Sequence, residues 1–304
     1  MREPTRHEPT RHELRIDGRL RAFTAVGADE GPEGRALVIA FHGSTQTGAG
    51  FRDFTGRALD RLAAEGRAVV LYPDGWRGHW NDDRRENWFA ARRVGIDEVA
   101  FFHALVAHAA ERYRTGPVHV VGYSNGGEMV LTLLHRVPEA LAGAVVISAT
   151  QPVPENWLSE QGGTSPRPSP VVVVHGTADP VVPYHGGPMP WYARWLFRVS
   201  GAALSAPQTA EYLARRNGID AAPDEAEVPS RRGMVQPARR ARQRPAVSRI
   251  RYGAGPGEVV LYRVEGGGHT VPGSPPAPAI LGATADVPAL QDVVGALIEG
   301  AHAE

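Results

Sequence analysis

The pentapeptide GYSNG at 122–126 constrains the fold more than any other feature of this chain. It follows the apolar run VHVV at 118–121 and precedes a stretch at 127–135 whose apolar residues have helical spacing. A strand, a sharp G-x-S-x-G turn and a helix, in this order, are typical of the turn that lifts a serine hydroxyl out of a sheet as a nucleophile. Because the turn is tight, we expect a side chain at either glycine to collide with the adjoining strand or helix. An ordinary turn is the alternative, but the flanking segments favour Ser124 as a nucleophile in a strained conformation.

Short apolar runs alternate with helix-like stretches along most of the chain. This alternation predicts an α/β fold with a mostly parallel central sheet and helices on both faces. In such a sheet, functional sites lie at the carboxyl ends of the strands. The expected strands are 19–26, 36–41, 68–72, 118–121, 144–147, 171–174 and 258–264, and the expected helices are 51–65, 96–113, 207–216 and 287–299.

Three segments do not follow the alternation. Residues 1–17 begin with a short tandem of Glu-Pro-Thr-Arg-His and are expected to form a disordered tail ahead of a catalytic domain at 18–304. Residues 186–205 are rich in aromatic side chains and form a candidate lid. Residues 221–247, rich in Pro, Arg and acidic residues, are expected to be a flexible polar insertion, with anion binding as the alternative.

Composition excludes several classes of function. The formal net charge is zero, so nucleic acid and membrane surfaces are not expected partners. The chain has no cysteine and no H-E-x-x-H spacing, so neither a disulfide nor a metal site is expected. No apolar stretch approaches the roughly 18 residues of a membrane helix. Because no apolar secretory leader is visible, we expect a cytoplasmic protein, with secretion as the alternative if translation starts elsewhere.

A serine nucleophile needs a general base and a carboxylate that orients the base. His269 follows the apolar run at 259–264 through a Glu-Gly-Gly-Gly loop, which is where a base would lie, and His185 is the remaining alternative. Asp179 follows the buried run VVVV at 171–174, and its alternative role is to cap a turn. The sequence therefore predicts Ser124, Asp179 and His269 as the catalytic residues.

The negative charge that develops on a substrate oxygen needs backbone N–H donors. The Asn125 amide lies at the start of a helix directly after Ser124, and the Ser44 amide follows the strand at 36–41. These two amides are the predicted oxyanion hole. Four side chains near these loops or in the candidate lid are predicted to contact substrate, with plain packing as the alternative for the aromatic ones: His42, Trp80, Tyr123 and Trp191.

Six segments resemble the polyhydroxybutyrate depolymerase and feruloyl esterase-like branch of the α/β-hydrolases. They are FHGSTQT, YPDGWRGHWND, GIDEVAFFHALV, GYSNGGEM, VVHGTADPVVPY and VLYRVEGGGHTVPG, in the family's order. The resemblance implies an α/β-hydrolase fold and a carboxylic ester hydrolase without a cofactor, with the three predicted catalytic residues and the first oxyanion loop at 42–44. The chain departs from the family by having Ser44 where Cys is frequent and Val271 where Trp is frequent.

These observations favour a serine ester hydrolase that acts through an acyl-enzyme. Its expected partner is a small-molecule or oligomeric ester with a short-chain, feruloyl-type aromatic or hydroxyalkanoate acyl group. Acyl transfer to another acceptor, or peptide hydrolysis, is the alternative that uses the same residues. A non-catalytic binding protein on the same scaffold is the alternative of a different class.

Overall fold

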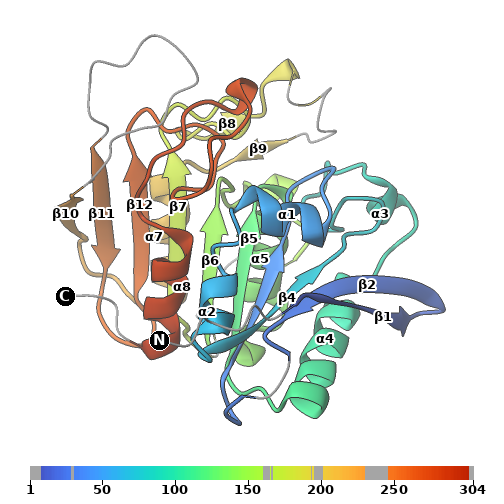
Figure 1. Ribbon diagram of the computed structural model, residues 1–304. Helices are drawn as coiled ribbons and strands as arrows, with labels where there is room; N and C mark the ends of the chain where they lie inside the picture. Colours follow the sequence, from blue (N-terminus) through green and yellow to red (C-terminus); the bar gives the residue numbers. More distant parts are fainter. Residues whose placement is uncertain are drawn as a thin grey trace.

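A computed structural model describes residues 8–28, 31–159, 165, 167–192, 194, 201–229 and 246–300. Within these residues, ten strands form one sheet in the order β1-β2-β4-β3-β5-β6-β7-β12-β11-β10 (Figure 1). The middle of the sheet is parallel and both edges are antiparallel hairpins. The mostly parallel sheet predicted from the alternating apolar runs is therefore present.

The parallel strands are the apolar runs of the sequence, and nearly all of their residues are buried. Because helices shield both faces of such a sheet from water, its strands are apolar at every position rather than at alternate ones. In spatial order they are β4 (Ala68–Pro73), β3 (Ala36–Phe41), β5 (Val118–Tyr123), β6 (Gly143–Ile147), β7 (Val171–Gly176) and β12 (Val259–Val264).

The edge hairpins correct two expectations. Strand β1 (Thr10–Ile16) pairs along its whole length with β2 (Arg19–Val26), so the predicted disordered tail at 1–17 is wrong for these residues. At the other edge, β10 (Asp224–Val228) pairs with β11 (Val247–Tyr252), so the predicted flexible insertion is wrong for β10. Residues 230–245 lie outside the described part of the chain. In both hairpins, pairing with a neighbouring strand orders a segment whose own sequence is polar.

Helices cover both faces of the sheet (Figure 1). One face packs against α4 (Glu98–Tyr113), α5 (Asn125–Arg136) and α7 (Ala206–Arg216). The other face packs against α1 (Gly48–Phe54), α2 (Asp60–Ala64) and α8 (Leu290–Glu299). The single helix expected at 51–65 is divided, because Gly56 and Arg57 have φ of 62° and 60°, outside the helical region.

Short elements connect these layers. They are α3 (Ala90–Arg93), the paired strands β8 (Gly187–Pro188) and β9 (Ala202–Ala203), and the 3-10 turns η1 (Pro138–Ala140), η2 (Pro154–Asn156) and η3 (Ala279–Leu281). The pairing of β8 with β9 brings the two ends of the candidate lid at 186–205 together. Residues 193 and 195–200 of this segment are outside the described part. The lid therefore stays a prediction. None of the described helices combines the length and apolar character needed to span a bilayer.

Candidate active site

Ser124 lies at the junction of β5 and α5 with φ 54° and ψ −121°, a backbone conformation that residues other than glycine rarely adopt. Its neighbours confirm the expected crowding. A Cβ atom on Gly122 would lie 2.1 Å from the Gly126 carbonyl oxygen, and one on Gly126 would lie 2.1 Å from the Phe41 carbonyl oxygen. The Ser124 N–H donates to the Ile147 carbonyl at 2.9 Å. Glycines on both sides of the serine therefore permit a turn that no larger residue would fit.

The three predicted catalytic residues come together at the carboxyl ends of β5, β7 and β12. The Ser124 Oγ is 2.9 Å from Nε2 of His269, and Nδ1 of His269 is 2.8 Å from Oδ2 of Asp179. His269 is buried, and the alternative base His185 is exposed on the loop after β7. The geometry therefore places His269, and not His185, between the serine and the carboxylate.

The Asp179 carboxylate is held in a single orientation. Its Oδ1 accepts the backbone N–H groups of Val181 and Val182 at 2.8 and 2.9 Å, which leaves Oδ2 to face His269. His175, also buried, has its Nε2 3.4 Å from the same Oδ2. Burial raises the pKa of Asp179, but the two histidines outweigh burial and hold that pKa well below its usual range. The carboxylate is therefore ionised and can stabilise a positive charge on His269.

Tyr123 has a role different from the predicted substrate contact. Its side chain is 3% exposed, and its O–H donates to the carbonyl of His269 at 2.8 Å. The Tyr123 and His269 rings lie 5.1 Å apart. The prediction that Tyr123 contacts substrate is wrong in this conformation, because the residue is covered by the loop that it supports.

The two amides predicted for the oxyanion hole are free. Among the described residues, neither the Ser44 N–H nor the Asn125 N–H has a hydrogen-bond acceptor. The Asn125 amide lies at the first position of α5, where the helix dipole favours negative charge. Both groups are therefore available to a ligand, and their role as oxyanion donors is a proposal.

His42 and Trp80 are fully buried, so the prediction that they contact substrate is wrong in this conformation. Nδ1 of His42 donates to the Gly43 carbonyl at 2.7 Å, and its Nε2 accepts the Gly75 N–H at 2.9 Å. Burial lowers the pKa of His42 to about 4, so the ring is neutral in this arrangement. The Trp80 indole N–H donates to the His42 carbonyl at 2.9 Å. Both side chains therefore support the loop that carries Ser44.

Trp191 is 80% exposed and is compatible with the predicted contact to substrate. Its neighbour Tyr192 donates through its O–H to the carbonyl of Pro180, the residue after Asp179. This hydrogen bond links the candidate lid to the loop of the carboxylate. A substrate contact at Trp191 stays a prediction.

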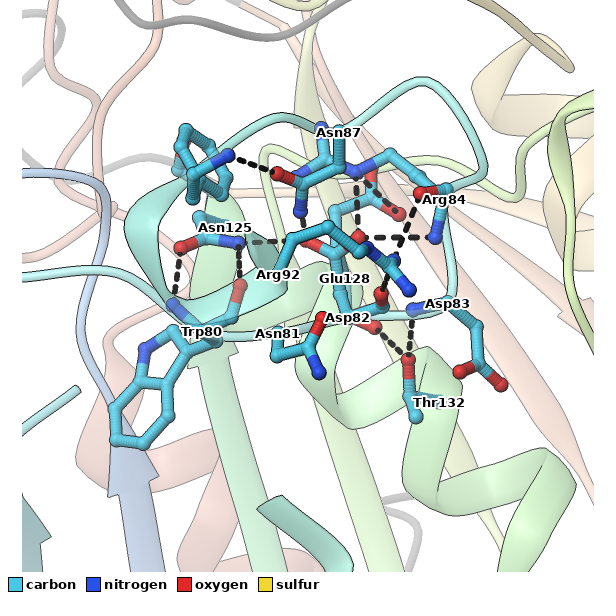
Figure 2. A network of polar contacts seen from close by, with 12 residues as sticks. Trp80, Asn81, Asp82, Asp83, Arg84, Asn87, Arg92, Asn125, Glu128 and Thr132 are labelled. Carbon is cyan, nitrogen blue, oxygen red and sulfur yellow. Dashed lines mark hydrogen bonds and ion pairs between the residues drawn. The ribbon is translucent and has the colours of Figure 1, made fainter. Parts of the chain in front are cut away.

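Sequence reasoning missed a buried polar network behind Asn125, which Figure 2 shows in detail. It joins Asp82 and Arg84, from the loop after β4, to Asn125 and Glu128 of α5. The signal that could have revealed it is the charged run DDRR at 82–85, which begins within one of the family-like segments. In the residues covered by the structure, no group of three or more His, Asp or Glu is arranged to hold a metal ion.

Comparison with known proteins gives three similarities at the sequence level. A family model described as serine aminopeptidase, S33, matches residues 32–165, a range that includes Ser124 and ends before Asp179. The NocK protein of Nocardia uniformis subsp. tsuyamanensis, whose name assigns it provisionally to the esterases, is 28% identical over 287 residues, covering 90% of this chain and 78% of NocK. Poly(3-hydroxyalkanoate) depolymerase C of Paucimonas lemoignei is 29% identical over 135 residues, covering 43% of this chain and 31% of the depolymerase.

The fold is also similar to a solved structure. Acetyl xylan esterase from Aspergillus awamori superposes with a TM-score of 0.57 at 15% identity, covering 96% of this chain and 100% of the esterase. Identity this low supports a shared fold and nothing finer.

Proposed function

We propose that this chain, an α/β-hydrolase related to esterases, is a serine hydrolase that cleaves carboxylic esters at Ser124. One observation carries the proposal: the hydrogen-bonded relay from Ser124 through His269 to Asp179, with contacts of 2.9 and 2.8 Å. Such a relay makes a hydroxyl nucleophilic at neutral pH, because the base accepts its proton as the new bond forms.

In the first half of the reaction, Ser124 Oγ forms a bond to the ester carbonyl carbon while its proton moves to Nε2 of His269. The carbonyl oxygen becomes an oxyanion, which the N–H groups of Ser44 and Asn125 would bind. The ionised Asp179 stabilises the imidazolium of His269. The carbon–oxygen bond to the alcohol then breaks, and the leaving oxygen takes the proton from His269 Nε2, which leaves an acyl-enzyme.

In the second half, water takes the place of the alcohol. His269 removes a proton from water as the water oxygen bonds to the acyl carbon, and a second oxyanion forms between the same two amides. The bond to Ser124 Oγ then breaks, and the serine oxygen recovers a proton from His269. The products are a carboxylic acid, an alcohol and free enzyme, so no redox step is required.

For the substrate, we propose an ester with a short-chain, feruloyl-type aromatic or hydroxyalkanoate acyl group. The name of one sequence relative, a poly(3-hydroxyalkanoate) depolymerase, supports the hydroxyalkanoate group, and the name of the structurally similar acetyl xylan esterase supports the short-chain group. Exposed Trp88 and Trp191, 52% and 80% exposed, are available to stack on an aromatic acyl group. Rates on p-nitrophenyl butyrate, methyl ferulate, acetylated xylan and hydroxybutyrate oligomers would rank the three possibilities.

The decisive experiment compares wild type with Ser124→Ala. A fluorophosphonate probe should label wild type at Ser124 and should leave the variant unlabelled. The variant should also lose p-nitrophenyl butyrate turnover by roughly four orders of magnitude or more, because the nucleophile is absent. An unlabelled, inactive wild type would favour a non-catalytic binding protein, and an active Ser124→Ala would place the chemistry elsewhere.

Peptide hydrolysis is a second candidate, since the matching family model is described by a serine aminopeptidase. The same relay would attack an amide, and His269 would then protonate an amine as it leaves. Turnover of aminoacyl p-nitroanilides faster than of p-nitrophenyl esters, lost in Ser124→Ala, would favour this candidate over the ester hydrolase.

A further inference from the structure

The side chain of Asn125 points into the loop at 80–84, and both of its polar atoms are engaged (Figure 2). Its Oδ1 accepts the Trp80 backbone N–H at 2.8 Å. Its Nδ2 donates to Oδ2 of Asp82 at 2.7 Å. Asn125 is 2% exposed, so these bonds form without competition from water. The backbone of the residue after the proposed nucleophile is therefore fixed by its own side chain.

The Asp82 carboxylate is itself held by a guanidinium group. Arg84 donates through Nε to Oδ1 at 3.0 Å and through Nη2 to Oδ2 at 2.6 Å, a two-point contact that fixes the carboxylate plane. Burial alone would lower the pKa of Arg84, but the carboxyl groups of Asp82 and Glu128 raise it above its ordinary value. From α3, Arg92 donates to the backbone carbonyls of both Asp82 and Arg84. The carboxylate that anchors Asn125 thus has little freedom to move.

The same loop reaches the second proposed oxyanion amide. Trp80, whose backbone N–H is bound by Asn125, donates through its indole N–H to the His42 carbonyl at 2.9 Å. His42 is two residues before Ser44 in the chain. The loop at 80–84 therefore contacts both segments that carry a free amide. It binds the side chain of Asn125 in one segment and the backbone carbonyl of His42 in the other.

We propose that Trp80, Asp82 and Arg84 position the oxyanion hole, with Asp82 acting through the Asn125 carboxamide to aim the Asn125 backbone N–H. Asp82, Arg84 and Trp80 are positioning residues in this proposal, since none of them would touch the substrate. The inference rests on the proposed function and adds to it a set of residues that governs binding of the transition state. A misplacement of about 1 Å at such a donor can cost roughly a hundredfold in rate.

The test compares Asn125→Ala and Asn125→Asp with Asp83→Asn. Asp83 is a matched control, because it is a buried carboxylate in the same loop whose contacts run to Ser159 and Arg136 instead of Asn125. With p-nitrophenyl butyrate, each Asn125 variant should lower kcat by about ten- to a hundredfold with little change in KM. The Ki of an alkyl trifluoromethyl ketone, which forms an oxyanion on the serine, should rise by a similar factor, and Asp83→Asn should behave as wild type.

The Asn125→Asp variant adds a pH readout that a purely structural role would not produce. It keeps the oxygen that accepts the Trp80 N–H, but it sets a second carboxyl group against Asp82. The ionisable groups around this pair are Arg84 in the loop, Arg92 of α3 and Glu128 of α5. At low pH the introduced carboxyl group is protonated and can donate to Asp82, so the ratio of variant to wild-type kcat should rise as pH falls.

The outcomes distinguish failure of the proposed function from failure of the positioning role. If wild type neither labels with fluorophosphonate nor hydrolyses esters, the proposed function fails. If wild type is active and folded Asn125→Asp keeps wild-type kcat and Ki at every pH, the positioning role fails while the proposed function stands. Should Asn125→Ala not fold, Asn125→Asp and Asp82→Asn decide the question by the same measurements.

Discussion

At the scale of single residues, the orientation of His269 depends on contacts at three of its atoms. Asp179 binds Nδ1 at 2.8 Å, Tyr123 donates to the carbonyl at 2.8 Å, and the backbone N–H donates to the Leu281 carbonyl at 2.6 Å. With Nδ1 carrying its proton toward Asp179, Nε2 is left as the acceptor that faces Ser124. The acid in this site thus selects a tautomer as well as an orientation.

Replacing Asp179 by Asn tests this selection. The backbone N–H groups of Val181 and Val182 would retain the amide oxygen, so the NH₂ group would face His269 and favour the wrong tautomer. We expect kcat to fall by roughly four orders of magnitude in a variant that still folds. Turnover of p-nitrophenyl butyrate would measure the effect, and a loss below tenfold would contradict the assignment of Asp179.

Tyr123→Phe tests the support of the His269 loop. Loss of the O–H leaves the buried His269 carbonyl without this donor, so we expect the free energy of unfolding to fall by about 1 kcal/mol and kcat to fall as well. Tyr72→Phe is the matched control, because the buried Tyr72 donates to Asp60 at 3.0 Å, away from the site. Urea unfolding should show similar losses for both variants. Equal kcat values would argue against a role for Tyr123 in the site.

At the scale of elements, hairpins complete both edges of the parallel sheet. β1 follows an alternating pattern in which His12, Leu14 and Ile16 are partly buried and the residues between them are exposed. The His12 ring stacks on Phe23 at 5.1 Å. A strand with such a polar sequence is ordered by its neighbour β2 and by α4, which it contacts, rather than by its own apolar content.

Deleting residues 2–17 should therefore destabilise the protein, whereas deleting residues 2–9 should have little effect because β1 begins at Thr10. The longer deletion removes the whole ladder with β2 and exposes an apolar edge, so we expect the melting temperature to fall by more than about 5 °C. Well below that temperature kcat should stay close to wild type, because β2, β4 and β3 separate β1 from β5. Equal melting temperatures for both deletions would contradict the contribution of β1.

At the scale of the whole molecule, acidic and basic residues balance, yet the cluster of Asp82, Arg84 and Glu128 brings two carboxyl groups to one guanidinium in the interior. Glu128 is the more weakly compensated of the two, since its Oε2 is 4.0 Å from Arg84 Nε. Burial raises the pKa of Glu128 to about 8, against the opposing effect of Arg84. At neutral pH the cluster is therefore close to neutral, with Glu128 protonated.

This protonation makes global stability depend on pH. The unfolded chain releases the Glu128 proton near its ordinary pKa of 4.5, whereas the folded protein keeps it until about pH 8. Rising pH in this window favours the unfolded state of wild type. We expect Glu128→Gln, which cannot titrate, to gain in free energy of unfolding over wild type from pH 4.5 to about 8 and to hold that gain above it. Urea unfolding across this range measures the gain, and a constant difference would contradict the raised pKa.

The α/β-hydrolase fold predicted from the sequence is confirmed, and the parallel strands lie close to the expected bounds. These features were predictable because a strand buried on both faces must be apolar throughout, and this requirement is visible as a continuous apolar run in the sequence. The G-x-S-x-G turn was predictable in part for a similar reason, since Gly122 is required by contacts with the nearby backbone of Gly126 and Gly127. Gly126, in contrast, is required by the distant carbonyl groups of Phe41 and His42.

The errors concern side chains whose environment comes from distant parts of the chain. His42 and Trp80 follow strands at the edge of the sheet where the site was expected. The sequence does not show which way a ring points, and both side chains point into the protein and bind backbone groups. Tyr123 is adjacent to Ser124 in the chain, yet its partner His269 is 146 residues away. The polar strands β1 and β10 were missed because their pairing partners, not their composition, order them.

By itself, therefore, the sequence determined the layered α/β architecture and the turn at Ser124, because burial on two faces and a tight turn leave local marks in residue type. Tertiary structure decided which histidine faces the serine, which amides stay free and how Asn125 is anchored. Those features depend on bringing the ends of β5, β7 and β12 together, and on burying Asp82 and Arg84 against each other and against α5. Contacts between residues so far apart in the sequence are not encoded in any local pattern of residues.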